Sequence, residues 1–152
     1  MVHINGYCSE LYFIESGLIR TYIINAKAQE VNIEFSLEGQ FITAIPAFYN
    51  KTTSEVAMQA LEETEVVCIS YDALAELYEE FDAMNKLGRL ITEENFVRRE
   101  IWHTHRNISE GIDRYKSILK NNPELIQRIP LNHLASYLGM SKEHLSRLRA
   151  EI

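Results

Sequence analysis

The stretch LNHLASYLGMSKEHLSRLRAEI, residues 131–152, has the apolar spacing of two short helices joined at a glycine. In its first half Leu134 and Leu138 lie four residues apart, and in its second half Leu145 and Leu148 lie three apart. Each half therefore presents one apolar face at helical spacing. The only glycine of the stretch separates the two halves. We predict two amphipathic helices that pack against each other across this glycine.

Small and capping residues stand where a tight helix pair needs them. Ser141 follows the glycine and can cap the second helix, because its hydroxyl can accept from a free backbone amide. Ala135 lies where the first helix would meet the second, and a small side chain there allows close approach. An alternative interpretation of this spacing, to a helix-turn-helix, is an ordinary helical hairpin in an all-α region. The pattern is that of a helix-turn-helix, and it is carried by Leu134, Ala135, Leu138, Gly139, Met140, Leu145 and Leu148.

The polar face of the second helix has the side chains of a DNA-reading helix. Lysine and arginine neutralise phosphates, arginine can form two hydrogen bonds with guanine, and glutamate can accept from cytosine. Each residue alone would be an ordinary solvated side chain, and only their gathering on one face favours DNA. The predicted DNA-binding residues are Ser141, Lys142, Glu143, Ser146, Arg147 and Arg149.

The charge of the chain is divided unevenly along its 152 residues. The net charge of −7 hides a change of sign. Residues 1–97 hold five basic and sixteen acidic side chains, a net −11, whereas residues 98–152 hold ten and six, a net +4. A basic C-terminal third suits a polyanion-binding part, and an acidic remainder suits a sensor part.

Composition predicts a globular cytoplasmic protein. Hydrophobic residues make up 46% and charged residues 24%. No apolar run reaches the roughly 20 residues of a membrane span, and the N-terminus lacks the pattern of a secretory signal. Cys8 and Cys68 cannot supply the four thiolates of a typical metal site, so we predict buried free thiols and no bound metal.

The N-terminal half has the pattern of short strands. Runs rich in Val, Ile, Tyr and Phe are separated by turn residues at 16–17, 25–29 and 37–39. We predict an α+β protein whose residues 1–81 form a β-sandwich or jelly roll. The predicted strands are 11–15, 17–25, 29–36, 55–61 and 65–70.

A long helix is predicted over residues 82–107, followed by a C-terminal helical domain over 108–152. The first helix of that domain runs over 108–121 and ends at the NPE of residues 122–124. Apolar residues recur in the long helix at heptad spacing, which predicts the seam of a homodimer. The alternative is a helix that packs only on its own sheet. A two-fold dimer would set two DNA-reading helices roughly 34 Å apart, one turn of DNA. The dimer residues are Leu87, Leu90, Val97, Ile101 and Ile108.

The order of sandwich, long helix and helix-turn-helix resembles the Crp/Fnr superfamily of bacterial transcription regulators, over almost the whole chain. The most specific parts are LYFIESGLIRTYI at 11–23, NKLGRLITEE at 85–94, which is similar to the form common in Bacteroidetes, and IPLNHLASYLGMSKEHLSRLR at 129–149. The resemblance implies a cyclic-nucleotide-binding-like domain, a homodimer and double-stranded DNA as partner. It also implies that Lys142, Glu143 and Arg147 read bases, with lysine where the family has arginine, which loses the bidentate fork.

The chain departs from the family in its effector region, residues 39–60. Cyclic-nucleotide-binding members use a glutamate for the ribose and an arginine for the cyclic phosphate, and both are absent here. A buried phosphate without a guanidinium would be poorly paired, so we expect an unidentified effector other than cyclic AMP, or none. An altered pocket, or ordinary turn and cap positions, would be made by Gly39, Gln40, Thr43, Thr52, Thr53 and Ser54.

Two further departures leave a second function open. Members of the superfamily usually have an N-terminal helix and further strands before the segment similar to LYFIESGLIR. Only ten residues precede it here, so the first strands of the sandwich are expected to be missing. No residues remain after 152 for a β-hairpin wing. The alternative function is therefore a degenerate ligand-binding or interaction module that does not bind DNA.

Catalytic motifs are not found in the sequence. His103 and His105 are two residues apart on a helix, so they point in different directions and cannot chelate one metal. No nucleophile stands beside an orienting base. We expect a protein that is not an enzyme and needs no cofactor.

Overall fold

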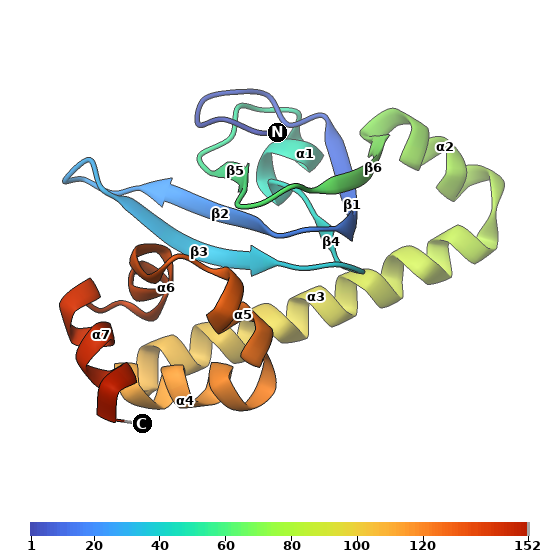
Figure 1. Cartoon of the computed structure of the whole chain (residues 1–152). Coiled ribbons are helices and arrows are strands. Elements are labelled where there is room, and N and C mark those ends of the chain that lie inside the picture. Colours follow the sequence, from blue (N-terminus) through green and yellow to red (C-terminus); the bar gives the residue numbers. More distant parts are fainter. Residues whose placement is uncertain (152) are drawn as a thin grey trace.

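The computed structural model describes residues 1–151, so Ile152, the last residue of the predicted DNA-binding domain, lies outside the described residues. Figure 1 shows a β-sandwich above one long helix, with the C-terminal helices gathered at one end of that helix. In chain order the elements are β1 (Glu10–Ser16), β2 (Ile19–Ile24), β3 (Glu30–Ser36), β4 (Phe41–Ile42), α1 (Ile45–Asn50), β5 (Ala57–Ala60), β6 (Glu65–Ser70), α2 (Tyr71–Glu80), α3 (Asp82–Ile108), α4 (Gly111–Asn121), α5 (Pro123–Arg128), α6 (Leu131–Leu138) and α7 (Lys142–Glu151).

Two antiparallel three-stranded sheets form the sandwich, in the orders β4-β1-β6 and β3-β2-β5. Ile14 on β1 and Ile19 on β2 are fully buried, because alternate residues of a strand point to the same side of its sheet. The N-terminal segment lies beside β5, where the Val2 carbonyl accepts from the Met58 amide at 2.9 Å. The predicted sandwich and its five strands are confirmed, with bounds that differ by at most two residues.

Gly17 makes the sharp turn between β1 and β2. Its φ of 102° lies in a region that other residues rarely adopt. A Cβ at this position would stand 2.6 Å from the Glu63 carbonyl oxygen and 2.7 Å from Thr64 Cα. The chain needs glycine here because the neighbouring backbone leaves no room for a side chain.

The long helix α3 has no buried residue along its 27 positions. Its only glycine, Gly88, lies against the Tyr78 ring of α2, where a Cβ would stand 2.3 Å from the Tyr78 hydroxyl. Neither α3 nor any other helix within residues 1–151 combines the length and apolar character that crossing a membrane requires.

One hydrophobic core joins the sandwich to the C-terminal helices. Leu18, in the turn between β1 and β2, and Phe35 of β3 pack in the same cluster as Leu134 and Leu138 of α6 and Leu145 of α7. Four of these five side chains are fully buried. The C-terminal helices are therefore docked on the β3-β2-β5 sheet in this conformation, as Figure 1 shows for α6 beneath β3.

Three expectations from the sequence were wrong in detail. The helix expected over residues 108–121 begins only at Gly111, after α3 has ended at Ile108. The NPE segment does not only end a helix: Pro123 also starts α5, because its fixed φ suits a first helical turn. Cys68 is exposed, since β6 lies at a sheet edge, whereas Cys8 is buried as expected.

Candidate nucleic-acid interface

Gly139 ends α6 and redirects the chain into α7. Its φ of 68° and ψ of 33° are left-handed, and its amide donates to the Ser136 carbonyl at 3.1 Å. The Met140 amide donates to the Ala135 carbonyl at 3.0 Å. These hydrogen bonds satisfy carbonyls that the helix end would leave unpaired.

The two helices bury the apolar side chains that the sequence pattern singled out. Leu134, Leu138 and Leu145 are fully buried, and Ala135 is 2% exposed, which allows α7 to approach α6 closely. Burying one leucine of this kind stabilises the fold by about 1.5–3 kcal/mol. The predicted packing of the helix pair is confirmed.

Arg114 of α4 holds the C-terminal end of α6 in place. Its Nε and Nη2 donate to the Leu138 carbonyl at 3.1 and 2.6 Å, and its Nη1 donates to the Ser109 and Arg106 carbonyls. This buried guanidinium was missed by the sequence analysis. The sequence feature that indicates it is spacing. Arg114 lies four residues before buried Ile118, on the apolar face of the same helix, where a charged side chain needs buried partners.

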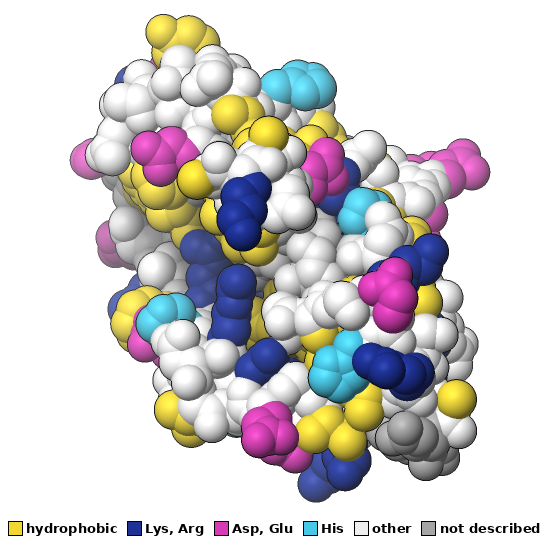
Figure 2. Space-filling model, turned by 90° about the vertical axis from the view of Figure 1, so that its left-hand side faces the viewer, with side chains coloured by type: hydrophobic (Ala, Val, Ile, Leu, Met, Phe, Trp, Pro, Cys, Tyr) yellow, Lys and Arg dark blue, Asp and Glu magenta, His cyan; other side chains and the backbone are white. Residues whose placement is uncertain are grey.

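The outer face of α7 carries exposed polar side chains. Ser141 caps the helix, since its Oγ accepts from the His144 amide at 3.1 Å, as predicted. A hydrogen bond from its own backbone amide, and another from Ser141, lower the pKa of Glu143, which keeps it a charged acceptor. Figure 2 shows basic, acidic and histidine side chains side by side at the lower right of this face. Exposed on α7 or at its cap are Ser141, Lys142, Glu143, His144, Ser146 and Arg147.

Arg149 is placed differently from the other predicted DNA-binding residues. It is also exposed, but its Nη2 donates to the Ile126 carbonyl at 3.3 Å. The guanidinium therefore links α7 to α5.

A polar cluster joins α6 to the β3-β2-β5 sheet. Buried Arg20 pairs with Glu30 at 2.7 Å, donates to Asn32 at 3.2 Å and lies 3.1 Å from His133 Nδ1 of α6. The backbone amide of Asn32 donates to the Ser136 hydroxyl at 3.1 Å. Burial, and then the Arg20 charge, lower the pKa of His133. His133 therefore stays neutral at neutral pH and can accept from Arg20.

A second link joins α5 to two loops of the sandwich. Arg128 pairs with Glu38 at 2.7 Å and also contacts Glu62. The hydrogen bond from Arg128 lowers the pKa of Glu38 to about 2. Both links connect residues more than sixty positions apart, so no local sequence pattern indicates them.

The six predicted effector residues do not share one cavity. Gly39 forms a turn with φ of 77°, and Gln40 accepts from Arg98 at 2.6 Å in a cavity beside α3. Thr43 donates to the Glu10 carbonyl and lines a different, apolar cavity of about 560 Å³. The remaining three lie at the N-terminal segment: Thr52 and Thr53 are exposed, and buried Ser54 is hydrogen-bonded to Gly6 and Val56.

Residues 39–60 offer no unpaired basic side chain for a cyclic phosphate. Lys51 is the only basic side chain within residues 39–60, and it pairs with Asp72 at 2.9 Å. Buried Arg20 is occupied by Gln59 and by the α6 cluster. A phosphate bound within residues 39–60 would therefore have no unpaired basic side chain of that segment beside it, and the absence of cyclic AMP binding stays a prediction.

The predicted seam of α3 is an exposed apolar strip. A shallow groove along it is lined by Leu90, Val97 and Ile101, together with the charged Glu93, Glu94 and Arg98. The exposed fractions are 46% for Leu87 and Leu90, 55% for Val97, 57% for Ile101 and 77% for Ile108. Trp102 beside the strip packs inward against Tyr137, and His103 is exposed. Within residues 1–151, His, Cys, Asp and Glu form no group of three that could hold a metal ion.

Three solved structures with this fold were compared. FixK2 from Bradyrhizobium japonicum has a TM-score of 0.82 at 15% identity, covering 99% of this chain and 78% of that chain. A transcriptional regulator of the Crp/Fnr family from Eubacterium rectale has a TM-score of 0.72 at 16% identity, covering 95% and 69%. The c-di-GMP responsive global regulator CLP of Xanthomonas campestris has a TM-score of 0.72 at 20% identity, covering 99% and 80%.

At these identities the structural matches establish a shared fold. Among curated proteins, none matches the sequence. The profile of the family described as cyclic nucleotide-binding domain matches residues 2–81, just over half of the chain. The chain therefore belongs to the cyclic nucleotide-binding domain family and has the fold of the Crp/Fnr regulators.

Proposed function

We propose that this protein is a DNA-binding transcriptional regulator of the Crp/Fnr type that acts as a homodimer. The observation that carries the proposal is the division of α7 into two faces. Leu145 and Leu148 are buried against the other helices, while Lys142, Glu143 and Arg147 are exposed together. A helix with this division can lie in the major groove without losing its own packing.

Charge supports DNA as the partner of this face. Residues 98–152 carry a net +4, although the whole chain carries −7. Lys142 and Arg147 would contact phosphates or guanine, and Glu143 would accept from cytosine. Ser141 and Ser146 would add hydroxyl contacts, and Arg149 would hold α7 on α5. Because the C-terminal helices are docked on an acidic sandwich, DNA must approach from the side of α7.

The exposed apolar strip of α3 supports the dimer. It is defined by Leu87, Leu90, Val97, Ile101 and Ile108, and a second copy of α3 would cover it. The proposed division into domains is a sandwich over 1–81, a dimer helix over 82–107 and a DNA-binding part over 108–152. Two of the three similar structures are regulators of gene expression, which favours a regulator over an enzyme.

The experiment is a titration of duplex DNA with the wild type and the Lys142→Ala/Arg147→Ala variant. Operator DNA selected from a random pool is used at one fixed salt concentration. Loss of base contacts should weaken binding by about 1–3 kcal/mol for each residue. The matched control is Lys86→Ala/Arg89→Ala, which removes two exposed charges from the far end of α3 and should bind like the wild type.

A second measurement separates DNA binding from the alternative of an interaction module. A protein that neutralises phosphates must lose affinity steeply as salt rises. If the wild type binds no duplex at low salt, or if the α7 variant binds as tightly as the control, the proposed DNA-binding role is wrong.

A further inference from the structure

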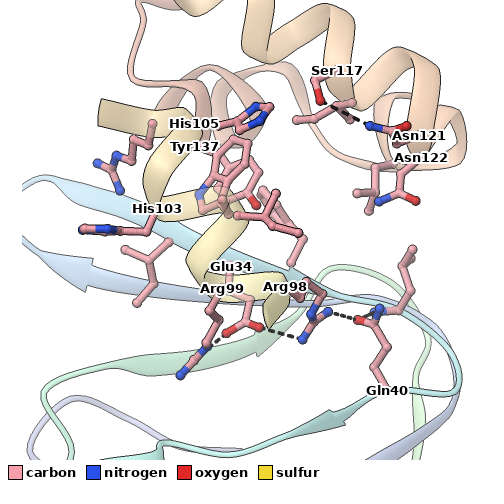
Figure 3. A pocket seen from close by; sticks show the side chains of 18 residues that line it. Glu34, Gln40, Arg98, Arg99, His103, His105, Ser117, Asn121, Asn122 and Tyr137 are labelled. Carbon is pink, nitrogen blue, oxygen red and sulfur yellow. Dashed lines mark hydrogen bonds and ion pairs between the residues drawn. The ribbon is translucent and has the colours of Figure 1, made fainter. Parts of the chain in front are cut away.

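A cavity of about 510 Å³ lies where the sandwich, α3 and the C-terminal helices meet. Figure 3 shows Glu34, Arg98 and Arg99 at one side of it, Tyr137 and His105 at another, and Asn121 across from them. Its volume is in the range of small-molecule sites, about 300–1,000 Å³. We call it the junction cavity. Because β3, α3, α4, α5 and α6 all line it, a ligand there would contact both the sandwich and the helices next to α7.

The charged lining of the junction cavity is mostly basic. Arg98 and Arg99 share one carboxylate, Glu34, at 2.9 and 2.6 Å. Arg106 also lines the cavity, and within residues 1–151 its guanidinium has no ion pair or hydrogen bond. The lining therefore carries three guanidinium groups and one carboxylate, and an anion would balance the excess positive charge.

One buried hydrogen-bond donor of the lining lacks an acceptor within the described residues. The Trp102 ring stacks on Tyr137, with centroids 4.0 Å apart, and its Nε1 is buried without a partner in the described part of the chain. A buried donor of this kind carries a desolvation cost that a ligand oxygen would remove. Burial raises the pKa of Tyr137, so its hydroxyl keeps its proton and can also donate.

Beside the polar side chains of Gln40, His103, His105, Ser117, Asn121 and Asn122, a further part of the lining is apolar. It comes from the strands, from α3 and from the helices after it, and it would cover a ligand body that avoids water. The apolar side chains are Ile33, Phe35, Leu37, Ile101, Ile118 and Leu125.

We propose that the junction cavity binds a small organic anion with an apolar body, such as a medium-chain or aromatic carboxylate. Arg106 would pair with the carboxylate, Trp102 Nε1 would donate to an oxygen, and the apolar side chains would cover the body. That such a ligand regulates DNA binding rests on the proposed function, whereas the binding itself does not.

The test uses Trp102, the only tryptophan of the chain, as a fluorescent reporter. The anionic dye anilinonaphthalene sulfonate and its neutral analogue phenylnaphthylamine are titrated into the full-length protein. The sulfonate should quench Trp102 saturably and bind at least about tenfold more tightly than the neutral dye, which corresponds to one charge-assisted hydrogen bond. Octanoate and benzoate are then compared as competitors of the sulfonate, and the one that displaces it at lower concentration shows whether the cavity prefers a linear or an aromatic carboxylate.

Three variants test the site. Arg106→Met should weaken sulfonate binding by about tenfold while leaving the neutral dye unchanged. Ser117→Phe, which fills the junction cavity, should abolish the binding of both dyes. Ile91→Phe fills the separate apolar cavity and should leave the affinities for both dyes unchanged. Near-ultraviolet circular dichroism checks that each variant is folded.

Equal affinity of the two dyes, unchanged binding by Arg106→Met, or loss of binding in Ile91→Phe would each overturn the proposal. None of these dye titrations contains DNA, so a protein that does not bind duplex DNA could still give the expected dye results. A protein that binds duplex DNA but does not give them would keep its proposed function, and only the proposed anion site would be wrong.

Discussion

The apolar strip of α3 makes a quantitative prediction for the double variant Leu90→Asp/Val97→Asp. These side chains are 46% and 55% exposed, so about half of each remains to be buried by a second copy. Full burial of a leucine or valine is worth about 1.5–3 kcal/mol, which leaves about 1 kcal/mol for each. Four such side chains per dimer contribute about 4 kcal/mol, and their loss raises the Kd about 1,000-fold.

The aspartates add the cost of placing carboxylates in an apolar seam, so the change in Kd is a lower bound. The fold of one chain should be nearly unaffected, because α3 has no buried residue. Sedimentation velocity over a range of concentrations measures the Kd, and circular dichroism measures the fold. Phe96→Asp is the matched control, since Phe96 is 64% exposed on α3 but lies outside the heptad series.

The expected result is a folded monomer for the double variant and a dimer for the wild type and for Phe96→Asp. A double variant that sediments as the wild type does would refute the seam. Dissociation by Phe96→Asp alone would mean that another face of α3 makes the contact.

Three further predictions concern the fold. Leu145→Ala leaves a cavity in the α6–α7 core and should lower the free energy of unfolding by about 2–5 kcal/mol in urea titrations, and a loss below 1 kcal/mol would contradict the packing. Gly17→Ala should lower the free energy of unfolding by about 2 kcal/mol or more in the same assay, because the alanine Cβ would meet the Glu63 carbonyl at a positive φ. A variant as stable as the wild type would mean that the turn has a different conformation. Because the folded-state pKa of His133 is lowered, stability is full above its ordinary pKa of about 6.5 and falls as the pH drops below it. His133→Gln should flatten this part of the stability profile, and an unchanged profile would show that His133 does not stay neutral beside Arg20.

Local pattern was a good guide to the strands and to the α6–α7 pair. The burial of Leu134, Leu138 and Leu145 follows from helical spacing, and the buried residues of β1 and β2 follow from alternation. The cap at Ser141 and the left-handed turn at Gly139 also follow from residue type. These features depend on neighbours within about five residues, which a sequence displays directly.

The candidate site was predicted less completely. The exposed α7 face agrees with its expected place, but the link from Arg149 to α5 was not foreseen. The six effector residues were grouped because they lie close together in the sequence. The structure distributes them among a turn, two cavities and the N-terminal segment, since adjacent residues on a strand or loop point to different sides.

The sequence by itself determined the family, the order of strands and helices, and the two faces of α7, because periodicity and residue type act within one element. Only the tertiary structure decided that α6 docks on the sandwich through Arg20 and His133, that Arg114 holds the end of α6, and that a basic cavity opens at their junction. Contacts of this kind join residues 24 to 113 positions apart. They exist only once the chain has closed those loops, and no local pattern specifies which side chains will then meet.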